Sequence, residues 1–222
     1  MSEPLVVGRR LGRDFQRGVS ALRDVDCRIA PNARIAVVGP SGSGKTTLLH
    51  ILAGLDKPTS GAVEWPRLGP IEELRPRHIG LVFQTPSLFP ALTVAQNVGL
   101  PMVLAGDPAS AGPAAAALLE LFGLGELRDK LPEELSGGQS QRIAMARALV
   151  MKPKLVLADE PTGQLDSITA QFFFDTVMEQ LEDTGIALVV ATHDEAVAAR
   201  MATRWTMDHG RLISEWPRQD AA

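Results

Sequence analysis

The chain has 222 residues, of which 45% are hydrophobic and 22% are charged, and its net charge is −4. This length and composition predict one globular domain with a core large enough to fold without disulfides. The mildly acidic balance gives no support for nucleic-acid binding. The single cysteine, Cys27, excludes an internal disulfide, and its place in an apolar-alternating stretch predicts a buried thiol in a reducing compartment.

No run of about 18 apolar residues occurs, so no membrane-spanning helix is predicted. The first four residues, Met1-Ser2-Glu3-Pro4, lack the basic and apolar regions of a signal peptide. We therefore expect a cytoplasmic protein. If it acts at a membrane, another chain must supply the membrane-embedded part.

Short apolar runs alternate with helical patterns, which is typical of an α/β fold with a mostly parallel sheet. In the first half we expect strands at 5–7 and 25–29 on an antiparallel edge, a strand at 34–38, a helix at 46–53, a strand at 79–83, and helices at 93–104 and 113–122. In the second half we expect a helix at 139–150, a strand at 155–158, a helix at 167–181, a strand at 187–192, a helix at 194–201, and a hairpin from 204–208 and 211–214.

The stretch from about 84 to 136 differs from its flanks, because it is helical with proline breaks and shows no clear strand. We interpret about 84–150 as a helical subdomain inserted into one domain, whose core sheet and antiparallel β edge come from 1–83 and 151–222. This organisation places the motifs described next on strand ends and helix starts.

A glycine-rich segment follows the strand at 34–38 and opens the helix at 46–53. It matches G-x-x-x-x-G-K-[ST] in full and reads Gly39, Pro40, Ser41, Gly42, Ser43, Gly44, Lys45, Thr46, with Thr47 next. Its glycines allow backbone N–H groups to wrap phosphates, and the helix start attracts their negative charge. We expect Lys45 to reach the β- and γ-phosphates of ATP or GTP and the Thr46 hydroxyl to ligate Mg²⁺. The alternative is a glycine turn without a ligand.

Two carboxylates, Asp159 and Glu160, end the apolar strand at 155–158. Ligands bind at the carboxyl ends of strands in open α/β sheets. Asp159 suits a role in holding Mg²⁺ through water, and Glu160 suits the general base that polarises the attacking water. The alternative is that both merely cap the turn before Pro161, but adjacent buried acids are costly without a cation nearby.

The segment Leu135-Ser136-Gly137-Gly138-Gln139 precedes the helix at 139–150. Ser136 and Gln139 form a capping-box pattern, which alone explains a helix start. A capping box needs no glycines, and each glycine in the first turn costs about 1 kcal/mol relative to alanine. Gly137 and Gly138 therefore indicate that another molecule's phosphate approaches this helix closely.

Together these segments resemble the nucleotide-binding subunit of an ABC (ATP-binding cassette) transporter, and the resemblance extends from about 5 to 214. It implies a P-loop ATPase fold with mixed sheet and helical subdomain, and a homodimer, or a heterodimer with a related cassette, that binds ATP between its subunits. The segment 135–139 would then face the ATP bound by the partner, and Ser136 and Gly138 would touch its γ-phosphate. Asp166, in the D-loop, would lie at the dimer seam.

Two single residues gain roles from the same resemblance. Gln84 matches the Q-loop, which contacts Mg²⁺ and water and senses the membrane partner. His193 matches the switch histidine, which contacts the γ-phosphate; without the matching strand before it, a surface or core histidine would be the better interpretation. The other histidines receive no role.

The chain departs from the family pattern at four places. It has no tyrosine, so Phe15 is the candidate for stacking on adenine, against the alternative of an ordinary edge residue. Ser140 and Gln164 replace residues that are commoner in the family, and the proline-rich stretch 61–84 is short, which predicts a trimmed antiparallel edge.

Short motifs around 54–61, 78–84, 100–101 and 159–163 are similar to those of macrolide-exporter and lipoprotein-releasing ATPases, although importers of amino acids or ions share most of them. The resemblance implies a transmembrane permease that docks near 84–92, where Leu88 and Phe89 are either exposed for this contact or packed inside. It also places the chain on the inner face of the membrane. A soluble ABC-type ATPase acting on nucleic acid or ribosomes, or a small-molecule kinase, would fit less well.

Overall fold

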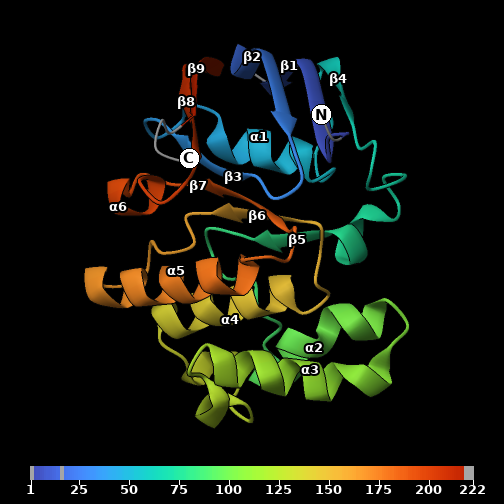
Figure 1. Ribbon diagram of the computed structural model, residues 1–222, viewed down its shortest axis with the longest axis vertical. Helices are drawn as coiled ribbons and strands as arrows, with labels where there is room; N and C mark the ends of the chain where they lie inside the picture. Colours follow the sequence, from blue (N-terminus) through green and yellow to red (C-terminus); the bar gives the residue numbers. More distant parts are fainter. Residues whose placement is uncertain (1–2, 16–17, 218–222) are drawn as a thin grey trace.

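The computed structural model describes residues 3–15 and 18–217, and it contains two sheets with helices between and beneath them (Figure 1). The larger sheet has six strands in the spatial order β5 (Ile79–Val82), β6 (Leu155–Asp159), β7 (Ala187–Ala191), β3 (Arg34–Val38), β8 (Thr203–Asp208) and β9 (Arg211–Pro217). All neighbours are parallel except β8 and β9, which form an antiparallel hairpin. The predicted α/β class with a mostly parallel sheet is confirmed.

The central strands bury both faces, as their unbroken apolar sequences predict. In β6, Val156 and Ala158 belong to one hydrophobic cluster, whereas Leu155 and Leu157 belong to the other. This alternation follows from the two-residue period of a strand. One cluster contains side chains of the helices drawn below the sheet, and the other fills the space between the two sheets around α1 (Lys45–Leu52) (Figure 1).

The smaller sheet is antiparallel, with strands in the order β2 (Val19–Ile29), β1 (Val6–Phe15) and β4 (Ser60–Glu64). The sequence predicted only short parts of β1 and β2, at 5–7 and 25–29. The structure extends both strands, because pairing continues through register shifts between Gly8 and Asp14 that interrupt the apolar alternation. β4 pairs with β1 although most of its residues are exposed, so no apolar pattern revealed it.

Helices α2 (Val94–Leu104), α3 (Pro108–Leu121) and α4 (Gly137–Leu149) lie between β5 and β6 in the chain. α2 starts at a capping box in which Thr93 and Gln96 bond each other's main chain. The sequence predicted that α3 starts at 113, but it starts at Pro108, because Asp107 caps it and the first turn tolerates proline. Three short helical turns are also present. One precedes β5 and two lie between α3 and α4: Leu74–His78, Gly125–Leu127 and Pro132–Glu134.

The last third contains α5 (Ser167–Leu181), whose bounds match the predicted ones, and α6 (Glu195–Ala198). The sequence predicted a helix at 194–201, but Asp194 is the cap, and bonds from Arg200 N to Val197 O and from Met201 N to Ala198 O tighten its end. The hairpin around His209 and Gly210 is confirmed. No helix within the described ranges is both long and apolar enough to cross a bilayer.

Candidate functional site

Four neighbouring parallel strands end at one edge of the larger sheet. In spatial order these are β5, β6, β7 and β3, and they are followed by Gln84, by Glu160, by His193 and by Gly39, respectively. Parallel strands place their carboxyl ends at the same edge, which is where ligands bind in open α/β sheets. Motifs that are far apart in the sequence are therefore brought to a common edge by the strand order.

The glycines of the loop between β3 and α1 are required by its backbone. Gly39 has φ of 146°, and Gly44 has φ of 103°. A β-carbon at Gly39 would overlap the carbonyl oxygen of Met207, and one at Gly44 would overlap that of Ala21. The loop thus folds tightly against β8 and β2. Ser43 is buried, and its hydroxyl has no hydrogen-bond partner among the described residues, so this donor is available within the loop.

Lys45 begins α1 and turns its ammonium group back onto the loop. Its Nζ atom donates to the carbonyl oxygens of Gly39, at 2.8 Å, and Pro40, at 3.1 Å. These neutral acceptors are weaker partners for an ammonium group than phosphate oxygens would be. The ammonium group is therefore held where a phosphate can replace a carbonyl.

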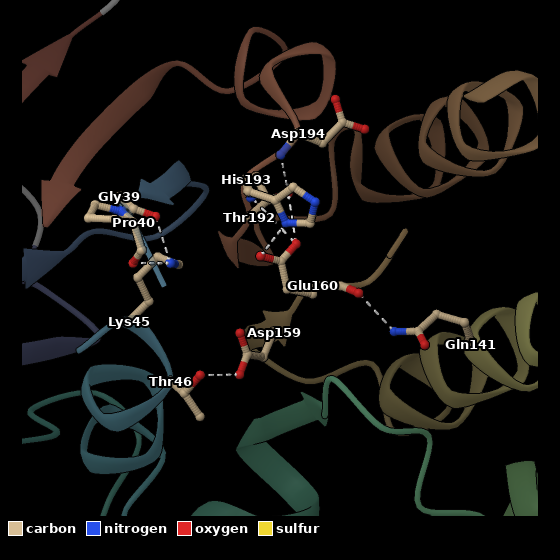
Figure 2. A network of polar contacts seen from close by, with 10 residues as sticks. All are labelled: Gly39, Pro40, Lys45, Thr46, Gln141, Asp159, Glu160, Thr192, His193 and Asp194. Carbon is tan, nitrogen blue, oxygen red and sulfur yellow. Dashed lines mark hydrogen bonds and ion pairs between the residues drawn. The ribbon is translucent and has the colours of Figure 1, made fainter. Parts of the chain in front are cut away.

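Thr46 on α1 lies next to Asp159, the buried carboxylate at the end of β6. The Thr46 hydroxyl donates to Asp159 Oδ2 at 2.6 Å (Figure 2). Asp159 is only 5% exposed, and burial raises its pKa above the usual value, although the hydrogen bond from Thr46 acts in the opposite direction. A buried carboxylate beside a hydroxyl is an oxygen donor set of the kind that Mg²⁺ prefers, and a cation would relieve its desolvation. The residues present thus fit Mg²⁺.

Glu160 lies next to His193 and Thr192, which follow β7. Glu160 Oε1 is 2.8 Å from His193 Nδ1, and Glu160 Oε2 accepts from the Thr192 hydroxyl at 3.3 Å and from the His193 backbone N–H at 3.4 Å (Figure 2). The Glu160 side chain is 12% exposed and that of His193 is 76% exposed. The carboxylate is therefore fixed in place, whereas the imidazole extends toward solvent.

The segment Ser136–Gln139 forms the predicted capping box at the start of α4. Gln139 N donates to Ser136 Oγ at 3.2 Å, and Ser136 N donates to Gln139 Oε1 at 2.9 Å. Within the chain both glycines face the loop that follows Glu160, and a β-carbon at Gly137 would meet the Gln164 amide, the flexible end of a side chain that can shift. One at Gly138 would lie 2.6 Å from Leu165 Cδ2.

The signature segment does not join the phosphate loop within one chain. Ser136 and Gln139 bond each other, and Gly137 and Gly138 lie against the loop that carries Gln164 and Leu165. Figure 2 shows α4 on the opposite side of Glu160 from Lys45. The family resemblance places the signature segment against the γ-phosphate bound by a second copy, and within a single copy it lies apart from the phosphate loop.

The remaining expected residues have varied surroundings. Asp166 caps α5, where the Thr169 hydroxyl and then the backbone N–H groups of Thr169 and Ile168 donate to its carboxylate and lower its pKa. Phe15 ends β1 and is 43% exposed, and the Arg13 guanidinium lies 4.7 Å from the centroid of its ring. Gln84 is exposed after β5, and Thr47 is half-buried in the first turn of α1.

Sequence reasoning missed three residues that contact the expected ones. Thr192 bonds Glu160, Arg13 covers one face of Phe15, and Gln141 on α4 donates from Nε2 to the Glu160 carbonyl oxygen at 3.0 Å. Gln141 is fully buried, and a glutamine on the apolar face of a helix was the one signal in the sequence that pointed to it.

The mostly parallel sheet, with the phosphate loop and paired carboxylates at the carboxyl ends of its strands, defines a phosphate-loop ATPase. The family model described as ABC transporter matches residues 22–163. The lipoprotein-releasing system ATP-binding protein LolD of Legionella pneumophila (strain Paris) is 42% identical, over 96% of this chain and 99% of that protein. The macrolide export ATP-binding/permease protein MacB of Bordetella avium (strain 197N) is also 42% identical, over all of this chain and 35% of its own length.

Solved structures give the same result. The dimeric structure of a post-hydrolysis state of the ATP-binding cassette MJ0796, bound to ADP and Pi, superimposes with a TM-score of 0.88. It is 33% identical, over 96% of this chain and 98% of that one. The chain belongs to the ABC transporter family and is an ATPase of the LolD- and MacB-like group. The expected family is thus confirmed.

Proposed function

We propose that two copies of this chain, or this chain and a related cassette, close around two ATP molecules and hydrolyse them to drive a separate membrane-embedded partner. One observation carries the proposal. The phosphate loop, the Asp159–Glu160 pair and His193 meet at one sheet edge, whereas Ser136 and its glycines lie away from it. A second copy, placed head to tail, would bring Ser136 and Gly138 to the γ-phosphate, with Gln139 as part of the cap and Asp166 at the seam.

Within each copy, the loop supplies the groups that hold the triphosphate. Backbone N–H groups, hydroxyls and the Lys45 ammonium group would bind the phosphates, and Pro40, which has no N–H, would only shape the loop. The residues of this loop are Gly39, Pro40, Ser41, Gly42, Ser43, Gly44, Lys45, Thr46 and Thr47. Phe15 would stack on adenine, because its ring is exposed and a ring face suffices for stacking. Arg13 covers one ring face, so the base would use the other.

Hydrolysis would depend on the carboxylates at the end of β6. Glu160 would accept a proton from the attacking water, and His193 would contact the γ-phosphate. Mg²⁺, when bound, would be held by Thr46, by Gln84 and, through water, by Asp159, and it would supply positive charge against the phosphate oxygens.

The membrane partner would dock on a groove next to 84–92. Phe89 is 54% exposed and lines this groove of about 310 Å³ with Leu100 and Leu104, whereas Leu88 packs inward. Buried Asn97 holds the Phe89 main chain from both sides, with Phe89 N to Asn97 Oδ1 at 2.7 Å and Asn97 Nδ2 to Phe89 O at 3.1 Å. The ring is thus presented on a fixed backbone, which suits a recognition site.

The cargo is best inferred from the relatives' names. Proteins named for lipoprotein release and for macrolide export share about two fifths of the sequence. We propose that this chain, positioned at the cytoplasmic face of a membrane, powers the release or export of lipoprotein, lipid, peptide or drug cargo. It would bind there through its permease, with the helical subdomain of 84–150 facing the partner.

The first test is the mass of Glu160→Gln in solution, measured by light scattering with and without Mg-ATP. This variant should bind ATP, hydrolyse it at least about a hundredfold more slowly than wild type, and shift from monomer to dimer. Adding Ser136→Arg should abolish the shift, because a bulky side chain would block the partner's γ-phosphate. A Glu160→Gln variant with wild-type turnover would remove Glu160 from the role of base.

A further inference from the structure

Glu160 has an unusual backbone. Its φ is 48°, in the left-handed region that residues with a β-carbon rarely adopt. Such a conformation persists only where the surrounding structure holds it. Because φ and ψ set the direction of the side chain, whatever holds this peptide also aims the Glu160 carboxylate.

Three hydrogen bonds hold the Glu160 main chain. Its N–H donates to Ala191 O, on β7, at 2.8 Å. Its carbonyl oxygen accepts from the Gly163 N–H at 3.1 Å and from Gln141 Nε2 at 3.0 Å. The first two come from the strand beside β6 and from the turn that follows it. Of the three, only the bond from Gln141 comes from a helix, α4, which reaches Glu160 from the side opposite to Lys45 (Figure 2).

The orientation of the Gln141 amide follows from its partner. A backbone carbonyl only accepts, so the amide nitrogen must face Glu160. The amide oxygen, Oε1, is then buried, with no hydrogen-bond partner among the described residues. Leaving a buried acceptor unpaired costs stability. An apolar side chain of the same size would avoid this cost, and the Glu160 carbonyl would still keep Gly163 as a donor. Gln141 therefore contributes little to stability, but it gives Glu160 a specific hydrogen bond.

We propose that Gln141 is a positioning residue for hydrolysis, which holds the left-handed Glu160 peptide so that the carboxylate stays aimed at the water. This rests on the proposed role of Glu160 as base. Gln141 lies on the helix that Ser136 caps, five residues further along. In the proposed dimer, the start of α4 in one copy would contact the ATP held by the phosphate loop of the other copy. The same helix would aim Glu160 of its own copy at the ATP held by its own phosphate loop.

The first experiment compares Gln141→Met with wild type in ATP hydrolysis by the full chain. Methionine keeps the volume and removes the donor. We expect kcat to fall at least about tenfold, KM for ATP to change less than about threefold, and the melting temperature to stay equal or rise. Ile143→Val, two residues along the same buried helix, is the matched control and should keep wild-type kcat. Gln141→Leu repeats the test if the methionine variant does not fold.

A double-mutant cycle then tests whether Gln141 acts through Glu160. In a Glu160→Gln background, Gln141→Met should slow the residual single-turnover rate less than about twofold. An undiminished tenfold loss there would overturn the proposal, as would a wild-type kcat for Gln141→Met or a lowered melting temperature that accounts for its loss. If Glu160→Gln alone hydrolyses ATP normally, the proposed function of Glu160 fails instead.

Discussion

Gly44 and Gly42 provide a matched pair for testing how the phosphate loop is built. Both have positive φ, 103° and 77° respectively. A β-carbon at Gly44 would overlap the carbonyl oxygen of Ala21 and lie 3.0 Å from Leu22 Cδ2, whereas nothing lies within 4 Å of one at Gly42. Alanine therefore adds backbone strain at both positions but steric overlap with β2 only at Gly44.

The expected magnitudes follow from these two terms. An alanine at positive φ costs about 1–2 kcal/mol, and overlap with well-packed atoms adds about 1–3 kcal/mol. Replacing glycine also restricts the unfolded chain, but this effect is the same for both variants and cancels in their difference. Apart from this shared effect, Gly42→Ala should lower the free energy of unfolding by about 1–2 kcal/mol and Gly44→Ala by about 2–5 kcal/mol, so that Gly44→Ala loses about 1–3 kcal/mol more.

Urea unfolding followed by circular dichroism, without nucleotide, measures both values. Nucleotide must be absent, because both residues belong to the proposed binding loop and a change in affinity would alter the apparent stability. Equal losses for the two variants, or a larger loss for Gly42→Ala, would refute the conclusion that β2 packs closely against the loop. Either result would also mean that contact with β2 does not explain the glycine at position 44.

The remaining predictions concern the metal site and the docking groove. Burial raises the pKa of Asp159, so the folded state binds its proton more tightly and stability falls as pH rises through the interval from the ordinary to the raised pKa. Asp159→Asn should therefore be at least as stable as wild type above that interval, lose this advantage at acid pH, and show a smaller rise in melting temperature with Mg-ATP. A less stable variant with an unchanged Mg-ATP effect would contradict this. Phe89→Asp should abolish transport and permease-stimulated hydrolysis while ATP binding stays intact. Ile213 is a comparably exposed apolar residue, at 59% against 54% for Phe89, and Ile213→Asp should keep transport and stimulated hydrolysis. Loss of nucleotide affinity in Phe89→Asp would count against the docking site.

The sequence predicted the central strands well, because residues buried on both faces leave an unbroken apolar run. β3 has the predicted bounds, and β6 differs by one residue. The antiparallel sheet was harder to predict. Bulges interrupt the alternation of β1, and Val63 is the only partly buried residue of β4. Exposed edge strands are formed by pairing rather than by burial, and pairing leaves little trace in one sequence.

The candidate site divides in the same way. Its residue types could be predicted, because a phosphate loop and paired carboxylates need particular side chains at particular spacings. The contacts between motifs could not, since they depend on strand order. The pairing of Glu160 with His193 brings together residues 33 positions apart, and it exists because β6 and β7 are neighbours with Asp159 opposite Ala191. The contact from Gln141 requires α4 to approach the end of β6, which no pattern in the sequence indicates.

The Glu160–His193 contact constrains how hydrolysis can begin. A general base must accept a proton from water, yet both carboxylate oxygens of Glu160 already have hydrogen-bonding partners in Thr192 and His193. Thr192 is buried and its hydroxyl also accepts from Asp194 N, so it is held in place, whereas the His193 side chain is 76% exposed. A γ-phosphate is a strong acceptor for imidazole. It would compete with Glu160 for Nδ1 and leave Oε1 to the water. Under the proposed roles, the same phosphate that is to be cleaved would release the base that cleaves it.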